Sequence, residues 1–207
     1  MIIKARHHFF IYPFFQRFSL RLIRRNFREV IMYGDYTDKG KPVLLLSNHT
    51  GWYDGFWAMY FNIIVLRKKF HFMMLEDQLR KHWYFNYTGG FSVRKSSRSI
   101  IESLKYTGEI LSDPENMVLM FPQGKIHSSY TKFHVFEKGI SRIFEEKRSN
   151  IQLIFMANMT DYLSSKKPTL YIYHTEYTGT DHSREAIQDA YNRFYGSCLE
   201  KQEQITD

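Results

Sequence analysis

Two side chains that together could activate a hydroxyl group, His49 and Asp54, stand five positions apart directly after the apolar segment Val43–Ser47. Five residues of continuous helix would place them about 140° apart, so they can meet only if His49 lies in a turn and Asp54 opens a helix. In that arrangement the carboxylate orients one imidazole nitrogen and leaves the other free as a general base. The alternative is a histidine that forms a purely structural hydrogen bond beside a strand end.

Two further segments carry residues suited to binding an acceptor. Arg94 ends the segment GFSVR at residues 90–94, and its planar guanidinium suits phosphate oxygens; the alternative is a solvated basic turn. The segment FPQGK at residues 121–125 directly follows an apolar strand, and its glycine allows the backbone to approach a ligand closely. FEKG follows at residues 136–139, so the motifs form an ordered set along the chain.

In this order and at these separations, the motifs resemble those of the glycerophospholipid acyltransferase family, which includes the 1-acylglycerol-3-phosphate acyltransferases. The resemblance covers about residues 40–160. It implies that His49 and Asp54 form a catalytic dyad, in which the histidine removes the proton of an acceptor hydroxyl that then attacks a thioester. The implied donor is acyl-CoA or acyl carrier protein, the acceptor is a lysophospholipid-like molecule of phospholipid biosynthesis, and no cofactor is needed.

Two of the motifs differ from the family pattern. The family's Ile-Asp-Arg is here Ser92-Val93-Arg94, which keeps the arginine that grips the acceptor phosphate and lacks its acidic neighbour. The family's Phe-Pro-Glu-Gly is Phe-Pro-Gln-Gly, so Gln123 keeps hydrogen-bonding capacity and loses the charge that helps to hold the acceptor. Another lipid hydroxyl, on a glycolipid, an aminolipid or a pigment, therefore stays open. The expected substrate-binding residues are Arg94, Phe121, Pro122, Gln123 and Gly124.

The positive charge of the chain is concentrated near its N-terminus. Of a net charge of +8, residues 1–33 carry +6, from seven basic side chains and one acidic one. A helix beginning near Pro13 would place arginines on one face and Phe14, Phe15 and Phe18 on an adjoining one. Such a helix is suited to the headgroup region of an anionic membrane, and the alternative is a surface helix packed on the domain. We therefore divide the chain into a membrane-associating helix, 1–33, and an acyltransferase domain, 34–207.

Beyond this segment, short apolar runs alternate with helical patterns. Strands are expected at 43–47, 70–74, 117–121, 151–156 and 170–174. Helices are expected at 54–64, 97–111, 137–147 and 183–199, the last capped by Asp181 or Ser183. Such alternation is typical of an α/β fold, here a single domain with a mostly parallel or mixed central sheet flanked by helices.

Composition narrows the class of protein. The single cysteine, Cys198, excludes an internal disulfide and fits a reducing compartment, and no apolar run reaches the roughly 18 residues of a membrane span. We therefore expect a peripheral protein on the cytoplasmic face of the membrane. The remaining histidines lack the paired spacing of zinc ligands, so no metal is expected. A non-enzymatic basic module that binds membranes or nucleic acid is the remaining alternative, but a nucleic-acid binder would spread its basic residues over a binding face.

Overall fold

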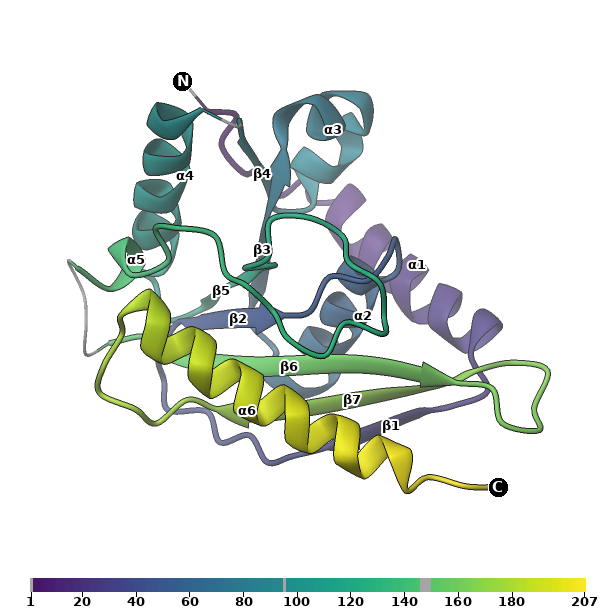
Figure 1. Cartoon of the computed structure of the whole chain (residues 1–207). Coiled ribbons are helices and arrows are strands. Elements are labelled where there is room, and N and C mark those ends of the chain that lie inside the picture. The colour runs from purple at the N-terminus through teal and green to yellow at the C-terminus, as the bar shows by residue number, and fades with distance from the viewer. Residues whose placement is uncertain (1, 95, 146–149) are drawn as a thin grey trace.

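The computed structural model describes residues 2–94, 96–145 and 150–207, and within them a mixed sheet of seven strands forms the middle of the molecule (Figure 1). The strand order is β1-β7-β6-β2-β5-β3-β4, and neighbouring strands are parallel except for the antiparallel pair β6 and β7. The strands are β1 (Val30–Tyr33), β2 (Val43–Ser47), β3 (Lys69–Leu75), β4 (Gly90–Val93), β5 (Asn116–Met120), β6 (Gln152–Asp161) and β7 (Thr169–Glu176). The predicted α/β class with a mostly parallel, mixed sheet is confirmed.

Helices cover both faces of this sheet. They are α1 (Ile11–Asn26), α2 (Asp54–Phe61), α3 (Glu76–Lys81), α4 (Ser97–Ile110), α5 (Arg142–Glu145) and α6 (Arg184–Glu203), with a π-helical turn at Asn62–Leu66 and a 3₁₀ turn at Trp83–Tyr87. In Figure 1, α6 lies across β6 and β7 on one face, and α1 and α2 lie on the other. The fold is therefore a three-layer α/β/α arrangement.

The central strand β2 is buried on both sides, which is why it reads as an uninterrupted apolar run. Alternate residues point to opposite faces. Leu44 and Leu46 join the core under α4 and α6, whereas Val43 and Leu45 join the core under α1 and α2. Each buried leucine side chain stabilises the fold by about 1.5–3 kcal/mol, so β2 is held firmly at the middle of the sheet.

The predicted elements agree closely in the middle of the sheet and less well at its edges. Strand β2 has the predicted bounds, and β5 ends at Met120, one residue before the predicted end. The predicted helix 54–64 is an α-helix followed by the π-helical turn, which stops at Arg67 in a left-handed conformation (φ 57°). Of the predicted helix 137–147, Arg142–Glu145 is helical, and residues 146–149 lie outside the described part of the chain.

The edge strands β1 and β4 and the short helix α3 were not predicted. β1 and β4 have four residues each, which is too few to establish a two-residue hydrophobic periodicity. At the N-terminus of α6, by contrast, the expected cap is confirmed, because the side chain of Ser183 accepts a hydrogen bond from the backbone N–H of Ala186.

The residues before α1 run beside β4 and the 3₁₀ turn. The backbone N–H of Arg6 donates to Asn86, that of His8 donates to Tyr87, and that of Gly89 donates to Arg6. Helix α1 then packs its buried side chains, such as Ile23, into the core shared with α2. Among the described residues, no helix combines the length and the apolar character that a membrane span requires.

Candidate active site

The turn after β2 lies at the carboxyl ends of the parallel strands, the edge of an α/β sheet where ligands bind. Asn48, the first residue of this turn, is buried and bonds across to β6. Its side-chain amide donates to the carbonyl of Asn158 (2.9 Å), and its side-chain oxygen accepts from the N–H of Asn158 (2.8 Å). This paired contact fixes the backbone that leads into His49.

His49 and Asp54 meet as the sequence predicted, with His49 in the turn and Asp54 opening α2. Nδ1 of His49 lies 2.7 Å from Oδ2 of Asp54, whose side chain is fully buried. The same oxygen accepts the backbone N–H groups of Thr50 (2.6 Å) and Gly51 (2.9 Å). These donors, together with the N-terminus of α2, stabilise the negative charge of the carboxylate and hold it in one position.

The hydrogen bonds of Asp54 determine which nitrogen of His49 carries the proton. An ionised carboxylate only accepts, so Nδ1 is the protonated nitrogen and Nε2 has a free lone pair. Within the part of the chain that the structure describes, Nε2 makes no hydrogen bond, and 24% of the His49 side chain is exposed. The ring is also stacked on Phe121, with centroids 4.1 Å apart. An oriented imidazole with an accessible basic nitrogen can take a proton from a bound hydroxyl.

The loop after β5 forms hydrogen bonds with both the N–H and the carbonyl of His49. The side-chain oxygen of Gln123 accepts the N–H of His49 (3.0 Å), and the carbonyl of His49 accepts the N–H of His127 (2.9 Å). Gly124 adopts a positive φ of 67°, and a Cβ there would lie 2.7 Å from the side chain of Glu137. The FPQG segment is therefore folded tightly between the dyad and the FEKG segment.

Gln123 points into the protein. It is 2% exposed, and its amide nitrogen lies 2.8 Å from Nδ1 of His134, which is itself buried. Burial lowers the pKa of His134 to about 4, with a smaller contribution from the neighbouring His127. Pro122 is buried beside Gln123, and its carbonyl accepts the N–H of Glu137 (2.8 Å). Both polar groups of the Gln123 amide are thus used within the protein.

Arg94 stands at the carboxyl end of β4, where a carboxylate holds it. Its Nε and Nη2 donate to the two oxygens of Glu76, at 2.7 and 2.8 Å, and Arg80 donates to the same carboxylate. The hydrogen bonds from Arg94 are the main reason why the pKa of Glu76 is lowered to about 2. Because 53% of the Arg94 side chain is exposed, its remaining N–H groups can still bind an anion.

The dyad and Arg94 share one edge of the sheet without touching. Strands β5 and β3 lie between β2 and β4 (Figure 1), so three interstrand steps of about 4.8 Å place strand β2 roughly 14 Å from strand β4. An extended molecule is needed to contact both. Among the described residues, no three histidine, cysteine or carboxylate side chains gather closely enough to hold a metal ion.

Two residues at this edge were not found from the sequence. Glu76 lies 18 positions before Arg94, and His134 lies 11 positions after Gln123. Neither forms a recognisable spacing with its partner, because their contacts arise from the adjacent strands β3 and β4 and from a folded loop. The Phe121–Gly124 region, by contrast, lies beside His49, where the order of the motifs suggested a shared site.

Comparison with known proteins addresses the family of the chain. Residues 29–158, more than half of the 207, match the family model described as Acyltransferase, whereas no curated protein sequence matches the chain. The match supports an acyltransferase of lipid biosynthesis in general terms and names neither the acyl donor nor the acceptor. It agrees with the resemblance carried by the motifs, all of which lie within the matched residues. The chain therefore belongs to the Acyltransferase family, the glycerophospholipid acyltransferases, and is an acyltransferase.

Proposed function

We propose that this acyltransferase moves a fatty acyl chain from the thioester of acyl-CoA or acyl carrier protein to a hydroxyl of a lysophospholipid-like acceptor. The single observation that carries the proposal is the geometry of the dyad, in which Asp54 holds Nδ1 of His49 and leaves Nε2 accessible at the sheet edge. Family membership supports acyl transfer, and the N–H groups of Arg94 that do not bind Glu76 support an anionic acceptor.

The reaction follows from the protonation state of His49. Nε2 takes the proton of the acceptor hydroxyl as its oxygen forms a bond to the thioester carbonyl carbon. The buried carboxylate of Asp54 stabilises the imidazolium that results. Collapse of the tetrahedral intermediate breaks the carbon–sulfur bond, and the imidazolium returns its proton to the departing thiolate. The products are the acylated lipid and a free thiol, so no covalent enzyme intermediate is required.

The acceptor is the least constrained part of the proposal. Because both polar groups of the Gln123 amide are used within the protein, Arg94 is the better candidate for recognising an acceptor headgroup. The alternative is the same chemistry on a lipid hydroxyl that carries no phosphate, on a glycolipid, an aminolipid or a pigment. Lipid mass spectrometry of cells with and without the protein, followed by assays of the purified enzyme on the changed lipids, distinguishes these acceptors.

Arg94→Ala is expected to raise the KM for a phosphate-bearing acceptor by about 10- to 100-fold, the usual effect of losing hydrogen bonds to a charged group. The KM for the acyl donor should change little. The matched control is Arg80→Ala, which removes the other arginine bound to Glu76 and leaves the end of β4 intact. An unchanged acceptor KM in Arg94→Ala would identify a neutral acceptor.

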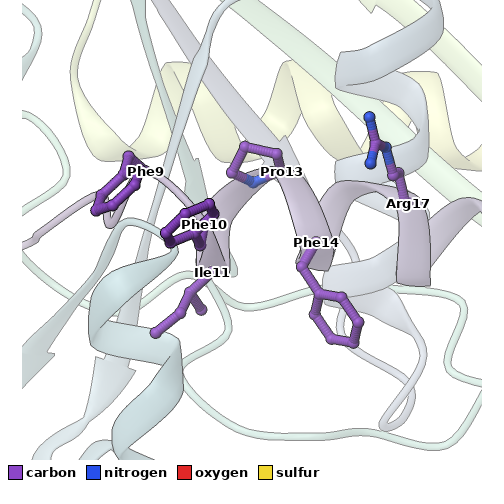
Figure 2. Close-up of a pocket in the computed structure, with 6 residues that line it drawn as sticks. All are labelled: Phe9, Phe10, Ile11, Pro13, Phe14 and Arg17. Atoms are coloured by element: carbon purple, nitrogen blue, oxygen red, sulfur yellow. The ribbon is translucent and has the colours of Figure 1, made fainter.

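We further infer that the protein acts at an anionic membrane surface, to which an exposed aromatic surface would bind. Phe9, Phe10 and Phe14 are each about two-thirds exposed or more and line a pocket of about 440 Å³ together with Ile11, Pro13 and Arg17 (Figure 2). Aromatic side chains beside arginine are suited to the boundary between lipid headgroups and acyl chains. The basic residues of α1 that support this inference are all exposed: Arg17, Arg21, Arg24 and Arg25.

The catalytic turn contributes to the same surface. Trp52, between the two dyad residues, is 64% exposed, and its ring lies 4.6 Å from that of Phe56. Phe18 of α1 packs against Phe56 as well, at 6.0 Å. The exposed aromatic surface of α1 thus continues to the turn that carries His49, which would place the dyad close to the lipid from which an acceptor is drawn.

A triple variant, Phe10→Ser, Phe14→Ser and Trp52→Ser, is expected to lower partitioning onto phosphatidylglycerol vesicles roughly 100-fold, because three rings no longer enter the interface. Sedimentation of vesicles with the full-length protein measures this. The control, Ile101→Ser, alters an exposed apolar residue of α4, on the opposite face of the sheet, and should leave partitioning unchanged. Undiminished binding by the triple variant would reject this surface as the membrane contact.

A further inference from the structure

His134 is clamped to the C-terminal helix α6 on one side and to the catalytic loop on the other. Its backbone N–H donates to the side-chain oxygen of Asn192 (2.7 Å), and its carbonyl accepts from the side-chain nitrogen of the same residue (2.9 Å). Gln188, one turn earlier on α6, accepts the N–H of Phe136 (2.8 Å). The backbone around His134 therefore has little freedom to move, so the ring presents Nδ1 to Gln123 from a fixed position.

The chain of hydrogen bonds from His134 to His49 has only one consistent direction. The N–H of His49 is a donor, so the Gln123 atom that faces it must be the oxygen, and the Gln123 nitrogen must face His134. Since that nitrogen donates, Nδ1 of His134 must accept, and the proton of the neutral ring resides on Nε2. Among the described residues, Nε2 of His134 is buried and has no acceptor. The contact with Gln123 is thus what selects this tautomer.

We propose that His134 is a positioning residue for the dyad: its Nδ1 holds the Gln123 amide in the one orientation that binds the peptide N–H of His49. A reversed amide would direct its NH₂ group at the N–H of His49 and its oxygen at Nδ1. The first of these contacts is repulsive. The turn would then lose one of the two hydrogen bonds, from Gln123 and from His127, that hold the backbone of His49 in front of Asp54. No sequence motif links α6 to His134, Gln123 and His49, because the hydrogen bonds among them form only in the tertiary structure.

The protonation pattern tests the proposal without any activity assay. In the full-length protein with ¹⁵N-labelled histidine, Nδ1 of His134 should be unprotonated and Nε2 protonated near pH 7, and His134→Asn identifies the resonances by their loss. A proton on Nδ1 of His134 would overturn the proposal. This measurement stands whatever reaction the protein catalyses, so its outcome is separate from the success of the proposed function.

Gln123→Glu provides a second spectroscopic test. A carboxylate only accepts, so it would accept both the His49 N–H and a proton on Nδ1 of His134, and the ring should therefore be protonated at Nδ1 at pH 7. In the part of the chain that the structure describes, the groups that face His134 are His127 from its own loop and the rings of Tyr191 and Tyr195 from α6, and none of these supplies a competing negative charge at this pH. An unprotonated Nδ1 of His134 in a folded Gln123→Glu protein would contradict the contact assigned between residue 123 and His134.

The positioning role itself rests on the proposed acyl transfer, and the kcat of that reaction measures it. His134→Leu removes the acceptor and is expected to lower kcat about tenfold at unchanged KM, the usual consequence of one disordered buried hydrogen bond. His134→Asn places an oxygen near the former Nδ1 and should recover most of that loss. The control is His174→Leu, which removes a buried histidine of β7 whose ring packs against Phe61. Equal kcat losses in His134→Leu and His134→Asn, or a comparable loss in a folded His174→Leu protein, would reduce His134 to a packing residue.

Discussion

His49→Ala is expected to lower kcat for acyl transfer by about 1,000-fold or more while the protein stays folded. A positioned general base contributes about 100- to 10,000-fold, and here the base is also the group that Asp54 orients. The fold should persist because the His49 ring is partly exposed, and its backbone contacts with Gln123 and His127 do not need the side chain. Release of free thiol from acyl-CoA in the presence of an acceptor measures kcat, and a thermal melt measures folding.

A control separates loss of the base from loss of any histidine. His182 lies in the loop before α6, away from the carboxyl edge of β2, and its ring stacks on Phe144 of α5. His182→Ala removes this ring. Its kcat should stay close to that of the unaltered protein. Retention of more than a tenth of the activity by a folded His49→Ala protein would exclude the dyad from the mechanism and return His49 to the structural role that the motif alone left open.

Asp54→Asn is expected to have the second largest effect, lowering kcat by about 1,000-fold and also weakening the fold. The carboxylate faces four donors: Nδ1 of His49 and the N–H groups of Thr50 and Gly51 at Oδ2, and the Thr50 hydroxyl at Oδ1. An amide that keeps its oxygen in the place of Oδ2 can still accept the three N–H donors, but it carries no negative charge to stabilise the imidazolium. If the NH₂ group faces His49, Nδ1 becomes the acceptor and the proton moves to Nε2, which removes the base. Replacing the charged acceptor of these buried hydrogen bonds by a neutral amide costs about 1–3 kcal/mol of stability.

Steady-state kinetics and urea unfolding measure the two parts of this prediction separately. Asp38→Asn is the matched control, because Asp38 pairs with Lys68 near the opposite edge of the sheet and is half exposed. That variant should leave kcat unchanged. An Asp54→Asn protein with kcat within a factor of ten of the unaltered value would show that the carboxylate only stabilises the turn.

The parts of the fold that were predicted correctly are those with strong local signals. β2 is apolar at every position but its last, because it is buried on both faces, and α6 has a capping serine followed by a long apolar periodicity. Edge strands such as β1 carry weaker signals, since four residues partly open to solvent need neither apolar runs nor strict alternation. The mixed sheet was expected, but the place of β1 beside β7 depends on long-range pairing.

The sequence by itself determined the dyad, because His49 and Asp54 are only five residues apart, and a strand, a turn and a helix start bring them together locally. It also determined the family, because the motifs occur in the family's order along the chain. Only the tertiary structure decided what the other motif residues contact. Arg94, after β4, meets Glu76, after the adjacent strand β3, and Gln123 turns inward to His134. Such pairings depend on which distant segments pack side by side and on which buried polar atoms need a partner.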